Sequence, residues 1–172
     1  MAWKILNQTY LNKNKWVSFR KDSCEVNGKT IDDYYVLEMQ DVSCVVAVTK
    51  EKKILFVKEY KHGVQKEILQ LPCGYIDKNE KPLQTAQREL MEETGYSSSQ
   101  WIYLGKCAGS PGRLNHYYHF FLAEECEKNA TQQLDDLETL HVLEYTFEEV
   151  KEKMKKNNID LTISTGLFLT KL

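Results

Sequence analysis

The stretch that decides the fold and the chemistry of this chain runs from Gly74 to Tyr96 and reads GYIDKNEKPLQTAQRELMEETGY. It carries four glutamates and one arginine between two glycines. Pro82 suits the first turn of a helix, because its fixed φ is helical and its missing N–H is not needed there. Gly95 suits the position just after a helix ends. We therefore predict a loop followed by a helix that begins at Pro82 and ends before Gly95.

The predicted helix separates apolar side chains from acidic ones. At 100° per residue, one face collects three apolar residues: Leu83, Ala86 and Leu90. Glu89 and Glu93 lie one turn apart beside that face. Arg88 and Glu92 form a second pair, spaced i, i+4, which can bond and hold each other's rotamers. Clustered carboxylate oxygens on a rigid element suit Mg²⁺ or Mn²⁺, and these ions in turn suit a substrate that carries phosphates.

The whole stretch resembles the signature of the Nudix hydrolases, Gly-x5-Glu-x7-Arg-Glu-hydrophobic-x-Glu-Glu-x-Gly-hydrophobic. The chain matches every fixed position: Gly74, Glu80, Arg88, Glu89, Leu90, Glu92, Glu93 and Gly95. The last position is usually aliphatic and is Tyr96 here. A solvated acidic helix would explain a lone Glu-Glu pair but not the complete pattern. The resemblance implies an α+β fold, namely an α/β/α sandwich with a mixed central sheet and an N-terminal β subdomain.

Length and composition fit a globular protein. The 172 residues are enough for one well-buried core, and the net charge of −2 gives no electrostatic reason to expect nucleic-acid or membrane-surface binding. The five cysteines are widely spaced without a CxxC pair, so neither a zinc site nor a disulfide framework is predicted. No apolar run has membrane-spanning length, and the first residues are not typical of a signal peptide. We expect a cytoplasmic protein with reduced thiols.

Alternating and continuous apolar runs predict how the chain is organised. Residues 1–40 are expected to form the β subdomain, with strands at Trp16–Arg20 and Tyr34–Met39 and a turn at Val26–Lys29. Residues 41–172 are expected to form the Nudix catalytic domain. Its predicted strands are Val42–Thr49 with Ile54–Val57 as hairpin partner, Ile68–Ile76, Trp101–Cys107, His116–Ala123 and Leu140–Tyr145. Two helices, Phe147–Lys156 and Leu161–Leu169, are expected to close the fold.

Segments outside the signature resemble the ADP-ribose pyrophosphatase branch of the Nudix enzymes. They are Phe56–His62, Leu69–Gly74 and Ser110–Gly112, the last placed where this branch carries its proline. The resemblance implies a homodimer in which the N-terminal subdomain is exchanged between protomers and helps to bind the base. It also implies a nucleotide-sugar substrate.

The same resemblance assigns roles at the metal site. It implies that Glu89 and Glu93 are metal ligands, that Glu92 is a third or water-mediated ligand, and that the backbone carbonyl of Cys73 is another. Arg88 is expected to orient a glutamate. Glu80 is expected to support the loop rather than take part in the chemistry.

The sequence offers two candidates for the general base. Many enzymes of this branch carry a glutamate after Ser-Pro-Gly, but residues 110–116 contain no carboxylate. Other members use a glutamate from a later loop just before a strand, and Glu138 matches that position best. The alternative for Glu138 is an ordinary solvated acid. His116 is a weaker candidate base, since it is expected to be a partly buried, hydrogen-bonded strand residue.

Aromatic and basic residues are the candidates for substrate binding. Trp16 lies where the branch places an aromatic that stacks on the base, with Tyr34 or Tyr35 on the opposite face; the alternative is that Trp16 is a core residue of a strand. Lys61 replaces the usual arginine near the phosphates and lacks its bidentate fork. The complete set of predicted substrate-binding residues is Trp16, Arg20, Tyr34, Lys61, Pro111 and Arg113.

The sequence therefore predicts a Mg²⁺-dependent pyrophosphohydrolase of nucleoside diphosphate sugars, with Mn²⁺ as the alternative ion and ADP-ribose as the first substrate candidate. Rival substrates are GDP-mannose, a dinucleotide or FAD. A ligand-sensing Nudix module without turnover is disfavoured by the complete metal cluster. An RNA pyrophosphohydrolase is disfavoured by the lack of a basic surface.

Overall fold

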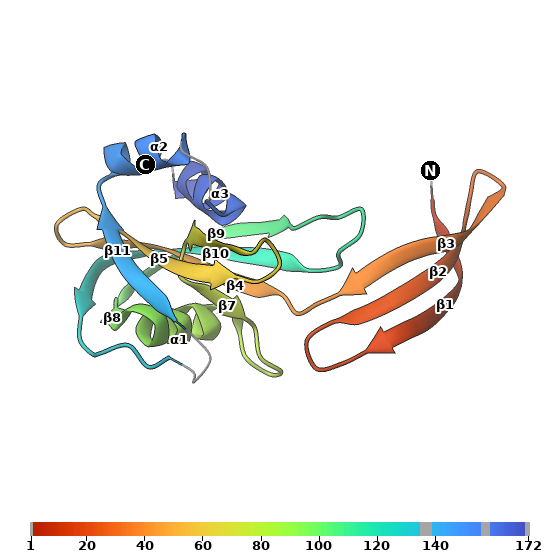
Figure 1. Ribbon diagram of the computed structural model, residues 1–172, viewed down its shortest axis with the longest axis horizontal. Helices are drawn as coiled ribbons and strands as arrows, with labels where there is room; N and C mark the ends of the chain where they lie inside the picture. The colour runs from red at the N-terminus through yellow and green to blue at the C-terminus, as the bar shows by residue number, and fades with distance from the viewer. Residues whose placement is uncertain (1, 135–138, 156–158, 171–172) are drawn as a thin grey trace. The chain divides into compact units, whose positions relative to one another are not determined.

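The computed structural model describes residues 2–134, 139–155 and 159–170 and divides into two compact units. The first unit contains residues 1–41 and 107–118, and the second contains residues 42–106 and 119–172. Figure 1 colours the chain along its length, so that each unit can be followed by its strand labels. The predicted β subdomain of residues 1–40 thus shares its unit with the loop that carries Ser-Pro-Gly.

The described residues of the first unit form a three-stranded antiparallel sheet of order β1-β2-β3, with β1 Lys4–Lys13, β2 Ser18–Val26 and β3 Lys29–Glu38. Asn27 and Gly28 both have positive φ, 52° and 72°, which is typical of a tight hairpin turn and agrees with the predicted turn. The prediction of a strand from Trp16 was wrong at its start. The side-chain oxygen of Asn14 accepts hydrogen bonds from the backbone N–H groups of Trp16 and Val17, so both residues belong to the turn before β2.

Eight further strands among the described residues form a mixed sheet that belongs mostly to the second unit. Its central order is β11-β5-β4-β10-β8, and β6, β7 and β9 pair with β5, β4 and β10. The strands are β4 Val42–Thr49, β5 Ile54–Lys61, β6 Lys66–Gln70, β7 Cys73–Tyr75, β8 Tyr96–Ser97, β9 Gln100–Ala108, β10 Tyr117–Lys128 and β11 Leu140–Tyr145. The predicted bounds of β4 and β11 are confirmed. The predicted run Ile68–Ile76 is instead two strands, because a Leu-Pro step separates β6 from β7.

Helices cover both faces of this sheet (Figure 1). On one face α1, Pro82–Thr94, buries Ala86 and Leu90 against Val45 and Ala47 of β4. On the other face α3, Leu161–Thr170, brings Gly166 against Val46, and α2 spans Phe147–Met154. Every residue of β4 is buried, which explains its continuous apolar sequence. The predicted α/β/α sandwich is confirmed. No helix in the described ranges is long and apolar enough to cross a membrane.

Candidate active site

The site is built on the loop and helix of the signature stretch. Strand β7 pairs with the end of β4, and the chain then turns into α1 at Pro82. The Lys81 N–H donates to the Gln84 side chain at 2.9 Å, which satisfies one of the backbone donors at the helix start. Gly95 ends the helix with a φ of 76°, and its N–H donates to Met91 O at 2.8 Å. The predicted limits of the helix are therefore confirmed.

Arg88 is the centre of the carboxylate cluster. Its guanidinium donates through Nε and Nη2 to both oxygens of Glu80, at 3.1 Å each. Its Nη1 donates to Glu89 at 2.7 Å and to Glu92 at 3.0 Å. The Arg88 hydrogen bonds lower the pKa of Glu80, and the bonds to Glu80, followed by the charge of Glu89, hold the pKa of Arg88 above its usual range. The guanidinium thus holds three carboxylates in one cluster and lowers the pKa of Glu80.

Glu80 has further partners that tie it to the loop. Its Oε2 accepts from the hydroxyl of Thr85 at 2.7 Å and from the Asp77 N–H at 3.3 Å. The sequence analysis missed Thr85, which is fully buried in the first turns of α1. The sequence does contain a signal for Thr85. This polar residue lies five positions after Glu80, on the face of the predicted helix that packs against the core.

Glu93 is a buried carboxylate beside this cluster. It is 6% exposed, and its Oε2 accepts from the Cys73 N–H at 3.0 Å. Burial raises the pKa of Glu93 well above its usual value, and the Cys73 thiol and the Glu89 carboxylate raise it further. The Cys73 N–H and the positive charge of Lys61 act in the opposite direction. A cation next to Glu93 would therefore relieve an unfavourable burial.

Gly74 allows the carboxylate of Glu89 to lie against the backbone of β7. A Cβ added at position 74 would lie 1.9 Å from Oε1 of Glu89 and 2.1 Å from its Cδ. Both are far below any allowed contact, so a side chain at position 74 would displace the carboxylate. The glycine of the signature thus permits this close approach of Glu89 to the backbone, which we call the Gly74 cradle.

The donor set fits a hard divalent cation. Glu89, Glu92 and Glu93 offer carboxylate oxygens, and the Cys73 carbonyl lies next to the Gly74 cradle. In the side-chain conformations shown, Arg88 binds Glu89 and Glu92 while Glu93 binds the Cys73 N–H. For this reason no group of three His, Cys, Asp or Glu side chains among the described residues is arranged as a ready metal site. Arg88 binds one oxygen of Glu89 and one of Glu92, so each carboxylate keeps a second oxygen for a cation.

The family model for the NUDIX domain matches residues 39–163 of the chain. The chain belongs to the Nudix family. An ADP-ribose pyrophosphatase of Bacillus subtilis (strain 168) is 35% identical over 116 residues, which are 67% of this chain and 63% of that protein. A methanol dehydrogenase activator of Bacillus methanolicus is 32% identical over 158 residues, 91% of this chain and 85% of that protein.

A crystal structure described as that of an ADP compounds hydrolase has the same fold. Its TM-score is 0.83 at 19% identity, over 99% of this chain and 93% of the other. The predicted resemblance to Nudix hydrolases of the ADP-ribose pyrophosphatase branch is confirmed, and the chain is a Nudix hydrolase.

The predicted substrate residues of this Nudix hydrolase lie in both units. Trp16 is 59% exposed and carries the ammonium of Lys15 over its ring at 4.2 Å, so the alternative that it is a core residue was wrong. Arg20 has ion-pair partners within its own sheet, Asp22 at 2.7 Å and Glu38. The Lys61 ammonium lies 2.5 Å from Glu59.

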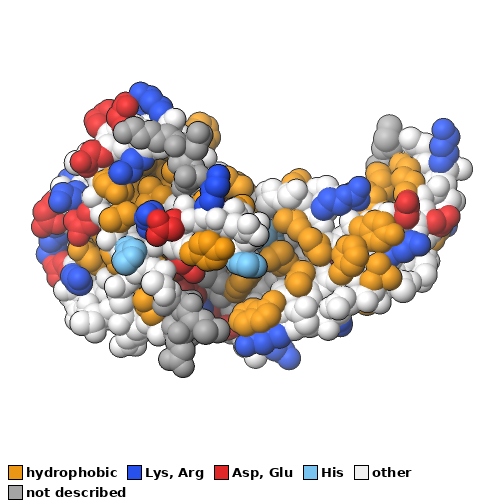
Figure 2. Space-filling view, viewed as in Figure 1, with side chains coloured by type: hydrophobic (Ala, Val, Ile, Leu, Met, Phe, Trp, Pro, Cys, Tyr) orange, Lys and Arg blue, Asp and Glu red, His pale blue; other side chains and the backbone are white. Residues whose placement is uncertain are grey.

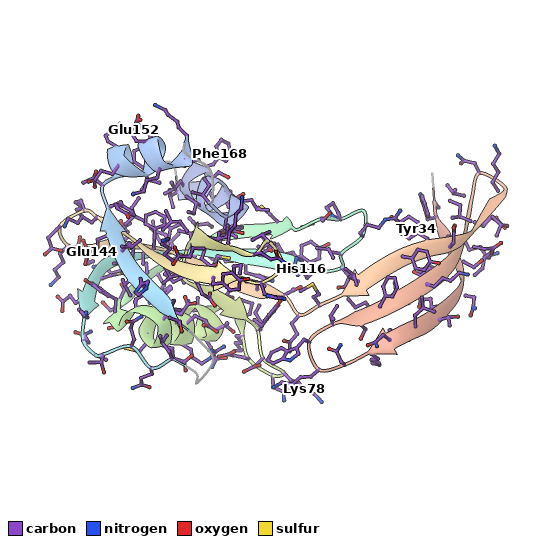
Figure 3. The ribbon with its side chains drawn as sticks, in the orientation of Figure 1. Tyr34, Lys78, His116, Glu144, Glu152 and Phe168 are labelled. Atoms are coloured by element: carbon purple, nitrogen blue, oxygen red, sulfur yellow. The ribbon has the colours of Figure 1, made fainter. Side chains whose placement is uncertain are left out.

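Tyr34, labelled in Figure 3, is partly enclosed within the first unit. Its ring contacts Trp3 edge-on at 5.3 Å and carries the guanidinium of Arg113 at 4.3 Å. Its hydroxyl donates to the Gly112 carbonyl at 2.5 Å. Tyr34 and Arg113 therefore hold each other in place, and Pro111 lies exposed in the same loop.

The two candidate bases differ in what the structure shows of them. Glu138 lies outside the described residues. His116 is 4% exposed, and neither of its ring nitrogens has a hydrogen-bond partner among the described residues, so the expectation of a hydrogen-bonded histidine was wrong. Its ring packs edge-on against Tyr118 at 5.0 Å.

Proposed function

We propose that this Nudix hydrolase cleaves the pyrophosphate bond of a nucleoside diphosphate sugar in a Mg²⁺-dependent reaction, with ADP-ribose as the first candidate. The products are a nucleoside monophosphate and a sugar phosphate. The observation that carries the proposal is the Gly74 cradle, where Glu89 packs against the backbone beside the buried Glu93. The relatives named ADP-ribose pyrophosphatase, from B. subtilis and Mycobacterium tuberculosis, support the choice of substrate.

In the proposed site Glu89, Glu92, Glu93 and the Cys73 carbonyl hold the ion. A bound divalent ion neutralises phosphate charge and lowers the pKa of water. Arg88 keeps the carboxylates close together before the ion arrives, which its bonds to Glu80, Glu89 and Glu92 support. Glu80 anchors Arg88 to the loop and does not touch the substrate.

Glu138 accepts the proton of the attacking water in this proposal. The stretch from Ser110 to His116 has no carboxylate, and His116 is buried. Glu138 best matches the position from which other members of this branch supply a glutamate base.

The base of the nucleotide stacks on Trp16 in our proposal. The exposure of this ring and its contact with Lys15 support the role, because an exposed indole offers a face for stacking and the ammonium offers charge for a phosphate. Arg113 and Lys61 supply further positive charge. Stacking tolerates any base, so GDP-mannose is the alternative substrate; a GDP-mannose pyrophosphatase of Escherichia coli (strain K12) is 29% identical over 119 residues.

We also propose that the protein is a homodimer that pairs through β1. This strand lies at the edge of its sheet, and all of its residues are exposed. Ile5, Leu6, Tyr10 and Leu11 leave apolar surface open, and Figure 2 shows hydrophobic side chains gathered over this sheet. An exposed apolar edge strand is a template for pairing with a second chain. Light scattering at micromolar concentration tests this, and a monomer would contradict it.

The function is tested by product release across a panel of nucleotide sugars with Mg²⁺, with Mn²⁺ and with EDTA. We expect ADP-ribose to give the highest kcat/KM, and EDTA to abolish turnover until Mg²⁺ is restored. Turnover that survives EDTA would contradict the metal role. Turnover of GDP-mannose above that of ADP-ribose would favour the alternative substrate, and binding without turnover would favour a sensor.

A further inference from the structure

Two cysteines face each other on neighbouring strands next to the candidate active site. Cys44 of β4 is the register partner of Cys73 of β7 in an antiparallel pair. The next pair along, Val45 and Pro72, is joined by a backbone hydrogen bond of 2.9 Å. Hydrogen-bonded and non-hydrogen-bonded pairs alternate in an antiparallel ladder. Cys44 and Cys73 therefore occupy a non-hydrogen-bonded pair, in which side chains lie closest.

The two thiols belong to one cross-strand pair and differ in their access to solvent. Cys44 is fully buried, whereas Cys73 is only partly buried. An oxidant in solution therefore meets Cys73 first, and Cys44 is already in place to react with the product.

We propose that Cys44 and Cys73 form a redox modification site, at which a hydroperoxide produces a cross-strand disulfide that switches the active site off. The Cys73 sulfur attacks one peroxide oxygen, so that an S–O bond forms and the O–O bond breaks. With hydrogen peroxide, this leaves a sulfenic acid and water, the thiol proton passing to the leaving oxygen. The Cys44 sulfur then displaces the sulfenic hydroxyl as a second water. Two thiols lose two electrons in total, and one peroxide is reduced to two waters.

The bond would disturb the site through the backbone of Cys73. The Cα atoms of a non-hydrogen-bonded pair lie about 4.5 Å apart, whereas a disulfide most often spans about 5.5 to 6 Å. The separation of about 4.5 Å is at the short end of the usual disulfide range of about 4.4 to 6.8 Å, so the bond can form, and its relaxation to the commonest length would move β7 away from β4 at Cys73. The Cys73 N–H, which holds Glu93 at 3.0 Å, and the adjacent Gly74 cradle move with it. This effect on turnover rests on the proposed function, whereas formation of the bond does not.

The test is titration of the reduced full chain with hydrogen peroxide, followed by peptide mapping by mass spectrometry and by activity assays before and after dithiothreitol. We expect a cross-linked peptide containing Cys44 and Cys73, two hydrogens lighter than its reduced parts. We expect activity to fall by about tenfold or more in step with the cross-link, as for other losses of groups that support a metal site, and to return with dithiothreitol.

Two variants sharpen the test. Cys44→Ala should keep basal activity and lose the part of the inactivation that dithiothreitol reverses. Cys126→Ala, which removes another buried cysteine of the same unit, should behave like the unmodified protein. The absence of the cross-linked peptide, or an unchanged dithiothreitol-reversible loss in Cys44→Ala, would overturn the site. A cross-link that forms in a protein without hydrolase activity would uphold the site and overturn only the proposed function.

Discussion

Each of the two units has an arginine bound to carboxylates, and the two clusters differ in charge balance. In the first unit Arg20 binds Asp22 and Glu38, all three on paired strands of one sheet. The Arg20 side chain is only 14% exposed and that of Asp22 only 5%. This cluster has an excess of one acid and is shielded from solvent, which is typical of an ion pair that stabilises a sheet.

The cluster of the second unit has a larger excess of acid. Arg88 binds three carboxylates, and Glu93 adds a fourth beside them. Repulsion between carboxylates costs stability unless a cation is bound, so a purely structural cluster gains nothing from the extra acids. The comparison teaches that the ratio of acids to arginine, rather than the presence of an ion pair, separates a candidate cation site from a structural network.

The largest expected effect comes from Glu93→Gln. Glutamine keeps the acceptor for the Cys73 N–H but removes the charge, so kcat should fall by about a thousandfold. The midpoint of thermal unfolding should not fall, because a buried charge is removed. Steady-state kinetics and a thermal melt measure both. Glu148→Gln, on the exposed face of α2, is the matched control and should change neither. Near-normal activity in Glu93→Gln would show that the cluster around Arg88 is not a cation site and does not differ in this respect from the cluster around Arg20.

Glu138→Gln is expected to cause the second-largest loss of activity. It keeps the size and polarity of the side chain and removes the base, so kcat should fall by about a hundredfold while KM for the nucleotide sugar stays nearly unchanged. His116→Ala should have little effect on kcat. Steady-state kinetics of the two variants, measured in parallel, show which residue is the general base. An inactive His116 variant and an active Glu138 variant would assign the base to His116, in the first unit.

Gly74→Ala tests the cradle without altering any charge. The added Cβ must displace the Glu89 carboxylate, so we expect activity to fall by about tenfold to a hundredfold with the fold retained. Gly63→Ala is the matched control, since a Cβ at that turn meets no atom within 4 Å. Kinetics together with circular dichroism measure both variants. Equal activity of the two would show that the close approach of Glu89 is not needed.

The smallest effect on activity is expected from Arg20→Gln. Loss of the guanidinium leaves Asp22 buried without its charge partner, so the free energy of unfolding should fall by about 1 to 3 kcal/mol. Both kcat and KM should stay within about twofold, which is below 1 kcal/mol. Urea denaturation measures the free energy of unfolding of Arg20→Gln and of the control Lys151→Gln, which breaks the exposed ion pair with Glu148. A large rise in KM without loss of stability would instead show that Arg20 binds substrate, as the sequence predicts.

The parts of the fold that followed from the sequence are those with strong local signals. The unbroken apolar run of β4 gives both of its ends, and Pro82 and Gly95 give the limits of α1. The Arg88–Glu92 pair follows from helical spacing. By contrast, β1 carries no buried face, so its sequence lacks the alternation that marks a strand.

The parts of the site that did not follow depend on contacts between distant residues. The bidentate contact of Arg88 with Glu80 requires the loop before α1 to fold back over the helix. The register that sets Cys44 opposite Cys73 depends on how β7 pairs with β4. Neither contact has a periodic signal in the sequence, because both are set by tertiary structure.

The close packing of α3 on β4 has a consequence for the synthesis of the protein. Gly166 lets the helix backbone approach β4 so closely that an added Cβ would lie 2.9 Å from Val46 and 2.8 Å from Leu71. A ribosome completes β4 long before it reaches α3, so one apolar face of the sheet stays open to water during most of synthesis. Such surfaces bind chaperones or aggregate. Nascent chains arrested before Leu161 should therefore crosslink to chaperones, and chains released with α3 should not.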